Sequence, residues 1–208
     1  MNIELSDVGK KYGRLWIFKG IQSTFKSNSI YGLIGFNGSG KSTLLQIISG
    51  YITPNRGSVS FFEDNQEIQI ENRYKSISIA APYLDLLEEF TVAESIELHT
   101  KFKALKSAIS PKTMLQEIDL EKHRDKLLSQ LSSGMRQRLK LALAIYSDTP
   151  ILLLDEPCAN LDKRWSEWFN TALLENAKDR IVIICTNSQE NEMRCINSHI
   201  LNVSDFQV

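Results

Sequence analysis

The chain has 208 residues, of which 42% are hydrophobic and 24% are charged, and its formal net charge is −1. This length is enough for one domain with its own core, and the near-neutral charge argues against nucleic acid held by a basic surface. No apolar run approaches the about 20 residues of a membrane-spanning helix, and the N-terminus lacks the pattern of a secretory signal. Three cysteines without a CxxC spacing favour a reduced, cytosolic chain.

The N-terminal part of the sequence predicts mainly strands. Runs of β-branched and aromatic residues, separated by Gly, Asn and Ser, mark five of them, at Ile3–Leu5, Ile21–Phe25, Ser29–Ile34, Ser58–Phe62 and Ile77–Ala81. A glycine-rich turn follows the third strand. After that turn, Ser42–Ser49 has the spacing of a helix with one apolar face.

The middle of the chain, from about residue 82 to residue 147, is predicted to be a helical insertion. Thr91 and Glu94 form a capping box before an apolar run, and a Ser-Pro pair is typical of the first residues of a second helix. A pair of serines precedes a third segment whose apolar residues have helical spacing. The three predicted helices are Val92–Leu105, Pro111 to about Glu117, and one capped by Ser132 or Ser133.

The C-terminal part alternates strands and helices. Its elements are predicted as strand Ile151–Leu154, helix Lys163–Ala177, strand Arg180–Thr186, a short helix near Gln189–Arg194 and strand Ile200–Val203. The apolar run at Ile151–Leu154 is typical of a strand that is covered on both faces. The pattern therefore predicts an α/β fold over residues 1–208, with a mostly parallel central sheet, an N-terminal antiparallel sheet and an inserted helical subdomain.

A phosphate-binding loop stands between the third strand and the first helix. The motif GxxxxGK[ST] is matched at every position, and the expected nucleotide-binding residues are Gly35, Phe36, Asn37, Gly38, Ser39, Gly40, Lys41, Ser42 and Thr43. Glycines let successive backbone N–H groups point at phosphate oxygens, and the helix N-terminus adds positive potential. Lys41 would approach the β- and γ-phosphates, and Ser42 would ligate Mg²⁺. The sequence thus predicts a protein that binds ATP or another nucleoside triphosphate with magnesium.

Two carboxylates follow the buried strand at Ile151–Leu154. Asp155 is placed to reach the magnesium ion, directly or through water. Glu156, one residue further on, suits the polarisation of an attacking water as a general base. A surface Asp-Glu pair would have the same local sequence, but the phosphate loop favours the functional interpretation.

A third motif precedes these carboxylates. Leu131 to Arg138 (Leu-Ser-Ser-Gly-Met-Arg-Gln-Arg) resembles the LSGGQ signature of ABC ATPases, with Ser133 for the first glycine and Met135 for the glutamine. Ser132, Ser133 and Gly134 at a helix N-terminus would form a second anion site. Together with the loop from Pro157 to Asp162, these motifs make the chain similar to the ATP-binding subunit of an ABC transporter from about Met1 to Val203.

The resemblance implies several further features. Tyr12 is expected to stack on adenine. The partner would be a second copy of the chain, or a homologous ATPase chain, in a head-to-tail dimer in which Ser132–Met135 of one chain covers the phosphate loop of the other. ATP binding would close this dimer and drive a separate membrane permease, which would hold the chain at the cytoplasmic face and dock partly on Tyr83–Glu89.

Two positions depart from the family pattern. A glutamine that contacts magnesium and the attacking water is replaced by Pro82, and the histidine that contacts the γ-phosphate is replaced by Asn187. Asn187 can donate a hydrogen bond but cannot shuttle a proton. We therefore expect Glu156, Lys41 and Asn187 to form a working but slow catalytic site.

Three alternatives remain open from the sequence. The departures at Pro82 and Asn187 are also compatible with an ATP-sensing interaction protein that barely hydrolyses. A soluble ABC protein of translation or DNA repair usually has two tandem units or a long coiled coil, and neither is visible here. A small-molecule P-loop kinase would leave Ser132–Met135 unexplained.

Overall fold

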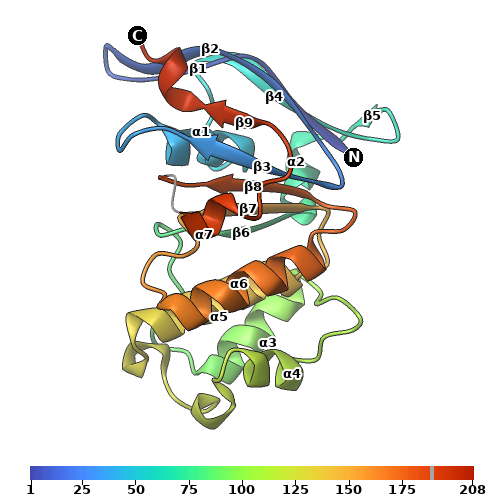
Figure 1. The fold of residues 1–208 in the computed structure, drawn as a ribbon. Coiled ribbons are helices and arrows are strands. Elements are labelled where there is room, and N and C mark those ends of the chain that lie inside the picture. Colours follow the sequence, from blue (N-terminus) through green and yellow to red (C-terminus); the bar gives the residue numbers. More distant parts are fainter. Residues whose placement is uncertain (188–189) are drawn as a thin grey trace.

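A computed structural model of the chain describes residues 1–187 and 190–208. Two sheets form the upper and central layers in Figure 1, and a helical lobe lies below them. The central sheet is parallel and has the order β6-β7-β8-β3-β9. Its strands are β3 (Ser29–Ile34), β6 (Ile77–Ala80), β7 (Ile151–Asp155), β8 (Ile181–Cys185) and β9 (Ile200–Asn202). This confirms the predicted α/β fold class.

The N-terminal sheet is antiparallel and has the order β2-β1-β4-β5. Its strands are β1 (Asn2–Tyr12), β2 (Leu15–Lys26), β4 (Arg56–Glu63) and β5 (Gln66–Glu67). The first two strands are much longer than predicted, because they pair up to Tyr12 and Leu15 around a tight turn. Gly13 has φ 59° in that turn, which glycine adopts without the steric cost of a Cβ.

Seven α-helices lie in the described part of the chain. They are α1 (Lys41–Ile48), α2 (Ile70–Arg73), α3 (Val92–Phe102), α4 (Pro111–Glu117), α5 (Ser133–Tyr146), α6 (Lys163–Asn176) and α7 (Glu190–Met193). The first residue of the predicted helix Gln189–Arg194 lies outside the described residues. Helix α3 ends three residues earlier than predicted, because Lys103 turns to an extended conformation.

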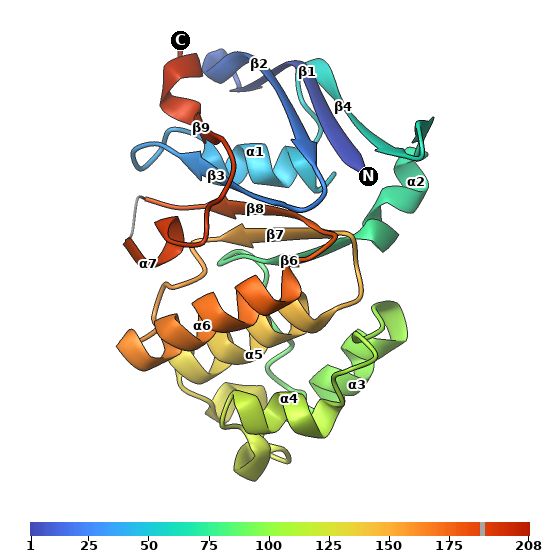
Figure 2. The same cartoon turned by 45° about the vertical axis from the view of Figure 1, so that its right-hand side comes forward.

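The helices cover the central sheet unequally. Figures 1 and 2 show α1 between the two sheets, with α5 and α6 on the opposite face of the central sheet. Apolar residues of β1, β2, α1 and β3 form one core, which includes Phe18, Leu44 and Leu45. A second core joins the lower face of the sheet to α3, α4, α5 and α6, and includes Ile96, Leu139 and Phe169. The parallel strands consequently have both faces buried, as their continuous apolar runs predict.

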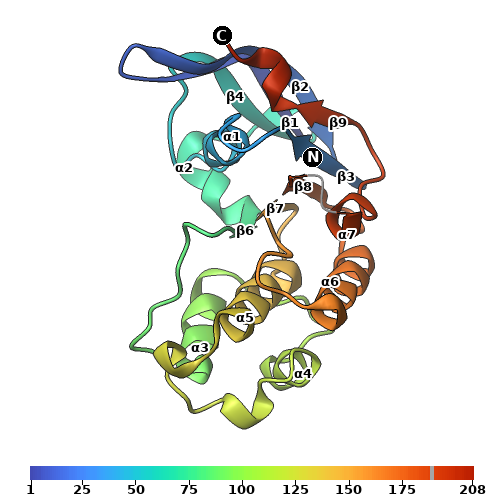
Figure 3. The same ribbon diagram turned by 60° about the vertical axis from the view of Figure 1, so that its left-hand side comes forward.

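The long segment between β6 and α3 runs along one side of the molecule (Figure 3). It begins next to the carboxyl end of the sheet and reaches the helical lobe, so it connects the central sheet to the predicted helical insertion. Thr91 caps α3 through a complete capping box with Glu94, as predicted. Ser132, rather than Ser133, caps α5, since its side chain accepts a hydrogen bond from Met135 N.

Candidate functional site

The phosphate loop joins β3 to α1 in a conformation that requires glycine. Gly35 and Gly40 have φ 147° and 100°, and a Cβ built on either would lie 2.5 Å from a neighbouring side-chain atom, Ser39 Oγ in the first case and Ile17 Cγ2 in the second. A larger residue at either position would therefore have to displace its neighbour. Two non-adjacent elements, the loop and β2, thus meet where the sequence places the phosphates.

Lys41 closes the loop from within. Its side chain is 5% exposed, and Nζ donates to the carbonyl oxygens of Gly35 at 2.9 Å and Phe36 at 3.2 Å. The buried Ser39 hydroxyl has no hydrogen-bond partner among the described residues. A buried cation with only carbonyl partners is well suited to an anionic ligand such as a phosphate group.

Asp155 ends β7 and lies beneath α1. The carboxyl group is buried, and neither of its oxygens has a well-formed hydrogen bond from the described residues. Burial raises the pKa of Asp155, and the nearby Ser42 hydroxyl and Lys41 charge oppose that rise. An orphaned carboxylate next to a hydroxyl fits the oxygen ligands that Mg²⁺ prefers, so both predicted metal residues are compatible with the ion.

Glu156 and Asn187 are brought together by the sheet. Because β7 and β8 are neighbouring parallel strands, the residues that follow their carboxyl ends lie side by side. Asn187 Nδ2 donates to Glu156 Oε1 at 2.7 Å. Glu156 has φ 46°, a left-handed conformation that costs about 1–2 kcal/mol in a residue with a Cβ, and its N–H is held by Cys185 O at 2.9 Å. Two of the three predicted catalytic residues, Glu156 and Asn187, therefore form one pair.

The serine-rich loop before α5 forms a different site. A cavity of about 340 Å³ is lined by this loop and by the segment after Glu156, and its walls include Ser132, Ser133, Gly134, Arg138, Asn160 and Trp165. A Cβ on Gly134 would lie 3.1 Å from Asn160 O, which explains the glycine. Among the described residues, no hydrogen bond or ion pair joins Ser132–Gly134 to the phosphate loop.

Tyr12 stands at the end of the β1–β2 hairpin and is 55% exposed. Lys10 Nζ lies 5.4 Å from the centre of its ring. The exposed ring leaves a surface on which a planar base could stack, so the role of Tyr12 stays a prediction. Among the described residues, no hydrogen bond or ion pair joins Tyr12 to the phosphate loop.

Pro82 lies near the catalytic pair. It is exposed and lines a cavity of about 460 Å³ together with Glu156, Gln137 and Lys140. Gln137 Nε2 donates to Pro157 O at 2.9 Å, and Lys140 Nζ donates to Ala81 O at 3.2 Å. The sequence interpretation missed both contacts. Gln137 could have been found from the serine-rich motif that contains it, whereas the reach of Lys140 depends on the path of the segment after β6.

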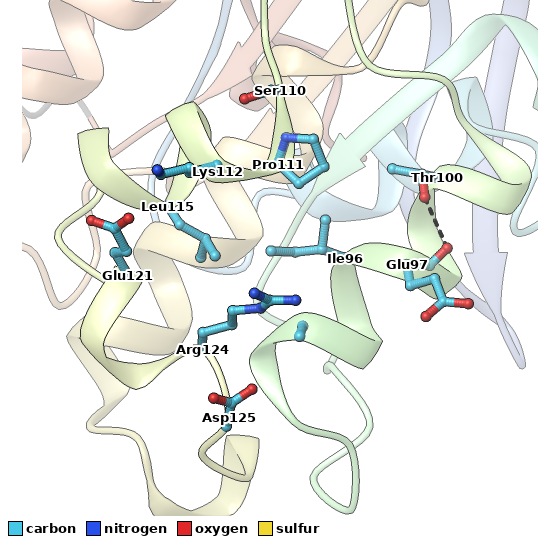
Figure 4. A pocket seen from close by; sticks show the side chains of 11 residues that line it. Ile96, Glu97, Thr100, Ser110, Pro111, Lys112, Leu115, Glu121, Arg124 and Asp125 are labelled. Atoms are coloured by element: carbon cyan, nitrogen blue, oxygen red, sulfur yellow. Dashed lines mark hydrogen bonds between the residues drawn. The ribbon is translucent and has the colours of Figure 1, made fainter.

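A larger cavity lies away from the predicted site residues. It has a volume of about 760 Å³ and lies between α3 and α4 (Figure 4). Ile96 and Leu115 form its apolar floor, while Lys112 and Arg124 lie among the charged residues around it. None of the predicted site residues lines this cavity, so cavity size does not identify the nucleotide site.

Comparisons with known proteins point to one family. A family model described as ABC transporter matches residues 18–159. An uncharacterised ABC transporter ATP-binding protein, YybJ of Bacillus subtilis, is 31% identical over 92% of this chain and 87% of its own length. Nod factor export ATP-binding protein I of Burkholderia orbicola is 29% identical, and the match covers 92% of this chain but only 64% of that protein.

Solved structures show the same fold. The post-hydrolysis dimer of the ATP-binding cassette MJ0796, bound to ADP and Pi, has a TM-score of 0.80 and 26% identity, and the match covers 97% of this chain and 95% of that one. A putative ABC transporter ATP-binding protein from Pyrococcus furiosus has a TM-score of 0.80 and 20% identity, and the match covers 100% of both chains. At 20% identity, the similarity to the Pyrococcus furiosus protein shows a shared fold and nothing more.

Proposed function

The chain belongs to the ABC transporter family and has the fold of its ATP-binding subunits, and from this premise we propose how its own residues bind and hydrolyse MgATP. The observation that carries the proposal is the Glu156–Asn187 pair, which stands next to the orphaned Asp155 and the phosphate loop. Glu156 would take a proton from an attacking water, and Lys41 would stabilise the charge that develops on the phosphates.

Ser42 and Asp155 would hold the magnesium ion. A bound Mg²⁺ supplies neutralisation of phosphate charge during transfer. The chain itself would supply the other interactions. Asp155 contributes a buried negative charge and Ser42 contributes a hydroxyl. The N-terminus of α1 contributes the N–H groups that orient the phosphates.

The proposed ATPase is slow. Pro82 has no side-chain oxygen for the attacking water, and Asn187 cannot take up a proton. Measured turnover of purified protein with ATP and magnesium should therefore be detectable and should disappear when EDTA removes the metal. Turnover that is absent in the isolated chain and in its membrane complex would instead favour an ATP-sensing interaction protein.

Asn187 is proposed as a γ-phosphate sensor that also orients Glu156. Asn187→Ala should reduce turnover about ten-fold, because a positioning hydrogen bond of roughly 1–1.5 kcal/mol is lost, while ADP affinity stays nearly unchanged. Asn187→His is the matched control and should be tolerated, since it restores a donor. ATP and ADP titrations alongside turnover test this. Equal losses of affinity for both nucleotides would show that Asn187 does not contact the γ-phosphate.

We propose a head-to-tail dimer in which Ser132, Ser133 and Gly134 contact the nucleotide on the partner. Ser132→Arg should prevent ATP-dependent dimerisation without changing ATP affinity of the single chain, because a bulky cation would fill the helix N-terminus and oppose its dipole. Ser129→Arg, three residues earlier and also exposed, is the control. Size-exclusion chromatography with ATP measures the effect. Normal dimerisation of Ser132→Arg would assign the contact to Ser133 or to the backbone.

The permease is proposed to dock beside the segment Tyr83–Glu89. An apolar cavity of about 330 Å³ is lined by Tyr51, Tyr74, Tyr83 and Leu84, among others. Tyr51 is 68% and Tyr74 59% exposed, so an apolar surface is available to a partner. No helix in the described part of the chain has the length and apolar character to cross a bilayer. We also propose that the permease holds the chain at the cytoplasmic face of the membrane.

The domain organisation is likewise a proposal: residues 1–208 form one domain, with a helical subdomain at about 82–147.

A further inference from the structure

A buried acid, Glu192, contacts the loop that follows Glu156. Glu192 belongs to α7, which Figures 1 and 2 show at the carboxyl ends of β7 and β8. Its side chain is 0% exposed, and Oε1 accepts a hydrogen bond from Cys158 N at 2.9 Å. The sequence interpretation assigned no role to Glu192, because one carboxylate on a four-residue helix carries no recognisable pattern.

The contact with Cys158 fixes the loop that carries Glu156. Cys158 is buried, so its N–H would lack a partner without this acceptor. In the same loop, Glu156 and Asn160 have left-handed backbone conformations. Two hydrogen bonds within the loop, from Ala159 N to Glu156 O and from Leu161 N to Cys158 O, stabilise it. Glu192 therefore connects this loop to α7 through a side-chain hydrogen bond.

Glu192 also lies near the second loop of the catalytic pair, which contains Thr186 and Asn187. Burial raises the pKa of Glu192, while the nearby Thr186 side chain and the bond from Cys158 lower it. Oε2 of Glu192 has no well-formed hydrogen bond from the described residues. Thr186 immediately precedes Asn187, and its N–H donates to Leu33 O at 3.1 Å. The Glu192 carboxyl group thus accepts a hydrogen bond from the loop that begins with Glu156, and it belongs to a helix that starts three residues after Asn187.

We infer that Glu192 is a positioning residue for ATP hydrolysis, which joins the Glu156 loop to the Asn187 loop so that the Glu156–Asn187 hydrogen bond keeps its geometry. This inference rests on the proposed function. Glu192 does not reach the nucleotide in this role, so its loss should change turnover and leave nucleotide affinity almost unchanged.

The test compares three variants of the full chain. Glu192→Leu keeps the approximate size but removes the acceptor, Glu192→Gln keeps an acceptor oxygen, and Glu190→Gln changes an exposed acid on the same helix that pairs with Arg194. We expect Glu192→Leu to lower kcat about ten-fold with KM for ATP within two-fold of wild type. Glu192→Gln and Glu190→Gln should stay within about three-fold of the wild-type kcat.

A double-mutant cycle separates positioning from a general loss of stability. If Glu192 acts by keeping the catalytic pair together, Glu192→Leu should cost less than two-fold in a chain that already carries Asn187→Ala. A full ten-fold further loss in that background would overturn the inference. Equal kcat values for Glu192→Leu and Glu192→Gln would also overturn it, because the acceptor would then have no role.

Hydrogen exchange of the Cys158 amide provides a readout without turnover. The exchange should be at least ten-fold faster in Glu192→Leu than in wild type and unchanged in Glu192→Gln. Unchanged exchange in Glu192→Leu would show that the contact does not hold the loop. A wild-type chain that hydrolyses no ATP would refute the proposed function. Even then, faster exchange of the Cys158 amide in Glu192→Leu would show that the Glu192–Cys158 hydrogen bond holds the loop.

Discussion

Glu156→Gln is expected to reduce ATP turnover about 100-fold or more while leaving ATP affinity within a few-fold of wild type. A glutamine amide cannot accept the proton of the attacking water, and the loss of a general base typically costs about 10²–10⁴ in rate. The substitution is nearly isosteric and can still accept through its carbonyl oxygen the hydrogen bond that Asn187 Nδ2 donates. The loop conformation at φ 46° is therefore expected to persist.

The same variant should trap the proposed dimer. If hydrolysis releases the two chains, a chain that binds but does not hydrolyse ATP should elute as a dimer when ATP and magnesium are present, and as a monomer with ADP. Asp205→Asn, a surface acid near the C-terminus, serves as the charge control. Turnover at the wild-type rate in Glu156→Gln would exclude Glu156 as the base. A monomer with ATP would count against the dimer instead.

The place and glycine-dependent conformation of the loop between β3 and α1 could be predicted because the information is local. Each glycine has to permit a loop conformation that the neighbouring residues define, and Lys41 follows at a fixed spacing. The position of Asp155 was equally accessible, since it ends an apolar strand. Both predictions depend on sequence separations of a few residues, where propensity and spacing are informative.

Contacts between distant segments were harder to foresee. The hydrogen bond between Asn187 and Glu156 depends on β7 and β8 being neighbours in the order β6-β7-β8-β3-β9, and only the family resemblance pointed to position 187. The tie between Glu192 and Cys158 spans 34 residues and involves a helix too short to show a periodicity. Tertiary packing, rather than local preference, places such residues.

The extended N-terminal hairpin shows the same limit on a smaller scale. Strong apolar runs marked Ile3–Leu5 and Ile21–Phe25, but the distal half of β1 and β2 contains Lys, Tyr and Gly and lacks a regular alternation. Register shifts along the pair account for this loss of pattern. Pairing of the two strands nevertheless carries Tyr12 to an exposed position at the end of the hairpin.

Lys41→Ala is expected to lower ATP affinity about 100-fold or more. Its ammonium group lies inside the loop, and its hydrogen-bond partners among the described residues are two carbonyl oxygens, so it can still pair with the charge of a phosphate. Removal of one hydrogen bond to a charged group costs roughly 1.5–3 kcal/mol, which corresponds to about 10–150-fold in binding, and the loop also loses its internal support. ADP, which lacks the γ-phosphate, should lose less affinity than ATP.

Three comparisons make the Lys41 result interpretable. Lys41→Met retains most of the aliphatic stem, so a fold defect caused by an empty space should be smaller than in Lys41→Ala while the loss of affinity should be similar. Lys41→Arg should not rescue binding, because a planar guanidinium does not fit a 5% exposed position that an ammonium occupies. Lys101→Ala removes an exposed lysine that pairs with Glu97 and should bind ATP normally. Isothermal titration with ATP and ADP, together with thermal unfolding of each variant, measures these effects. ATP affinity within a factor of two of wild type in a folded Lys41→Met chain would refute the assignment of this loop to phosphate binding.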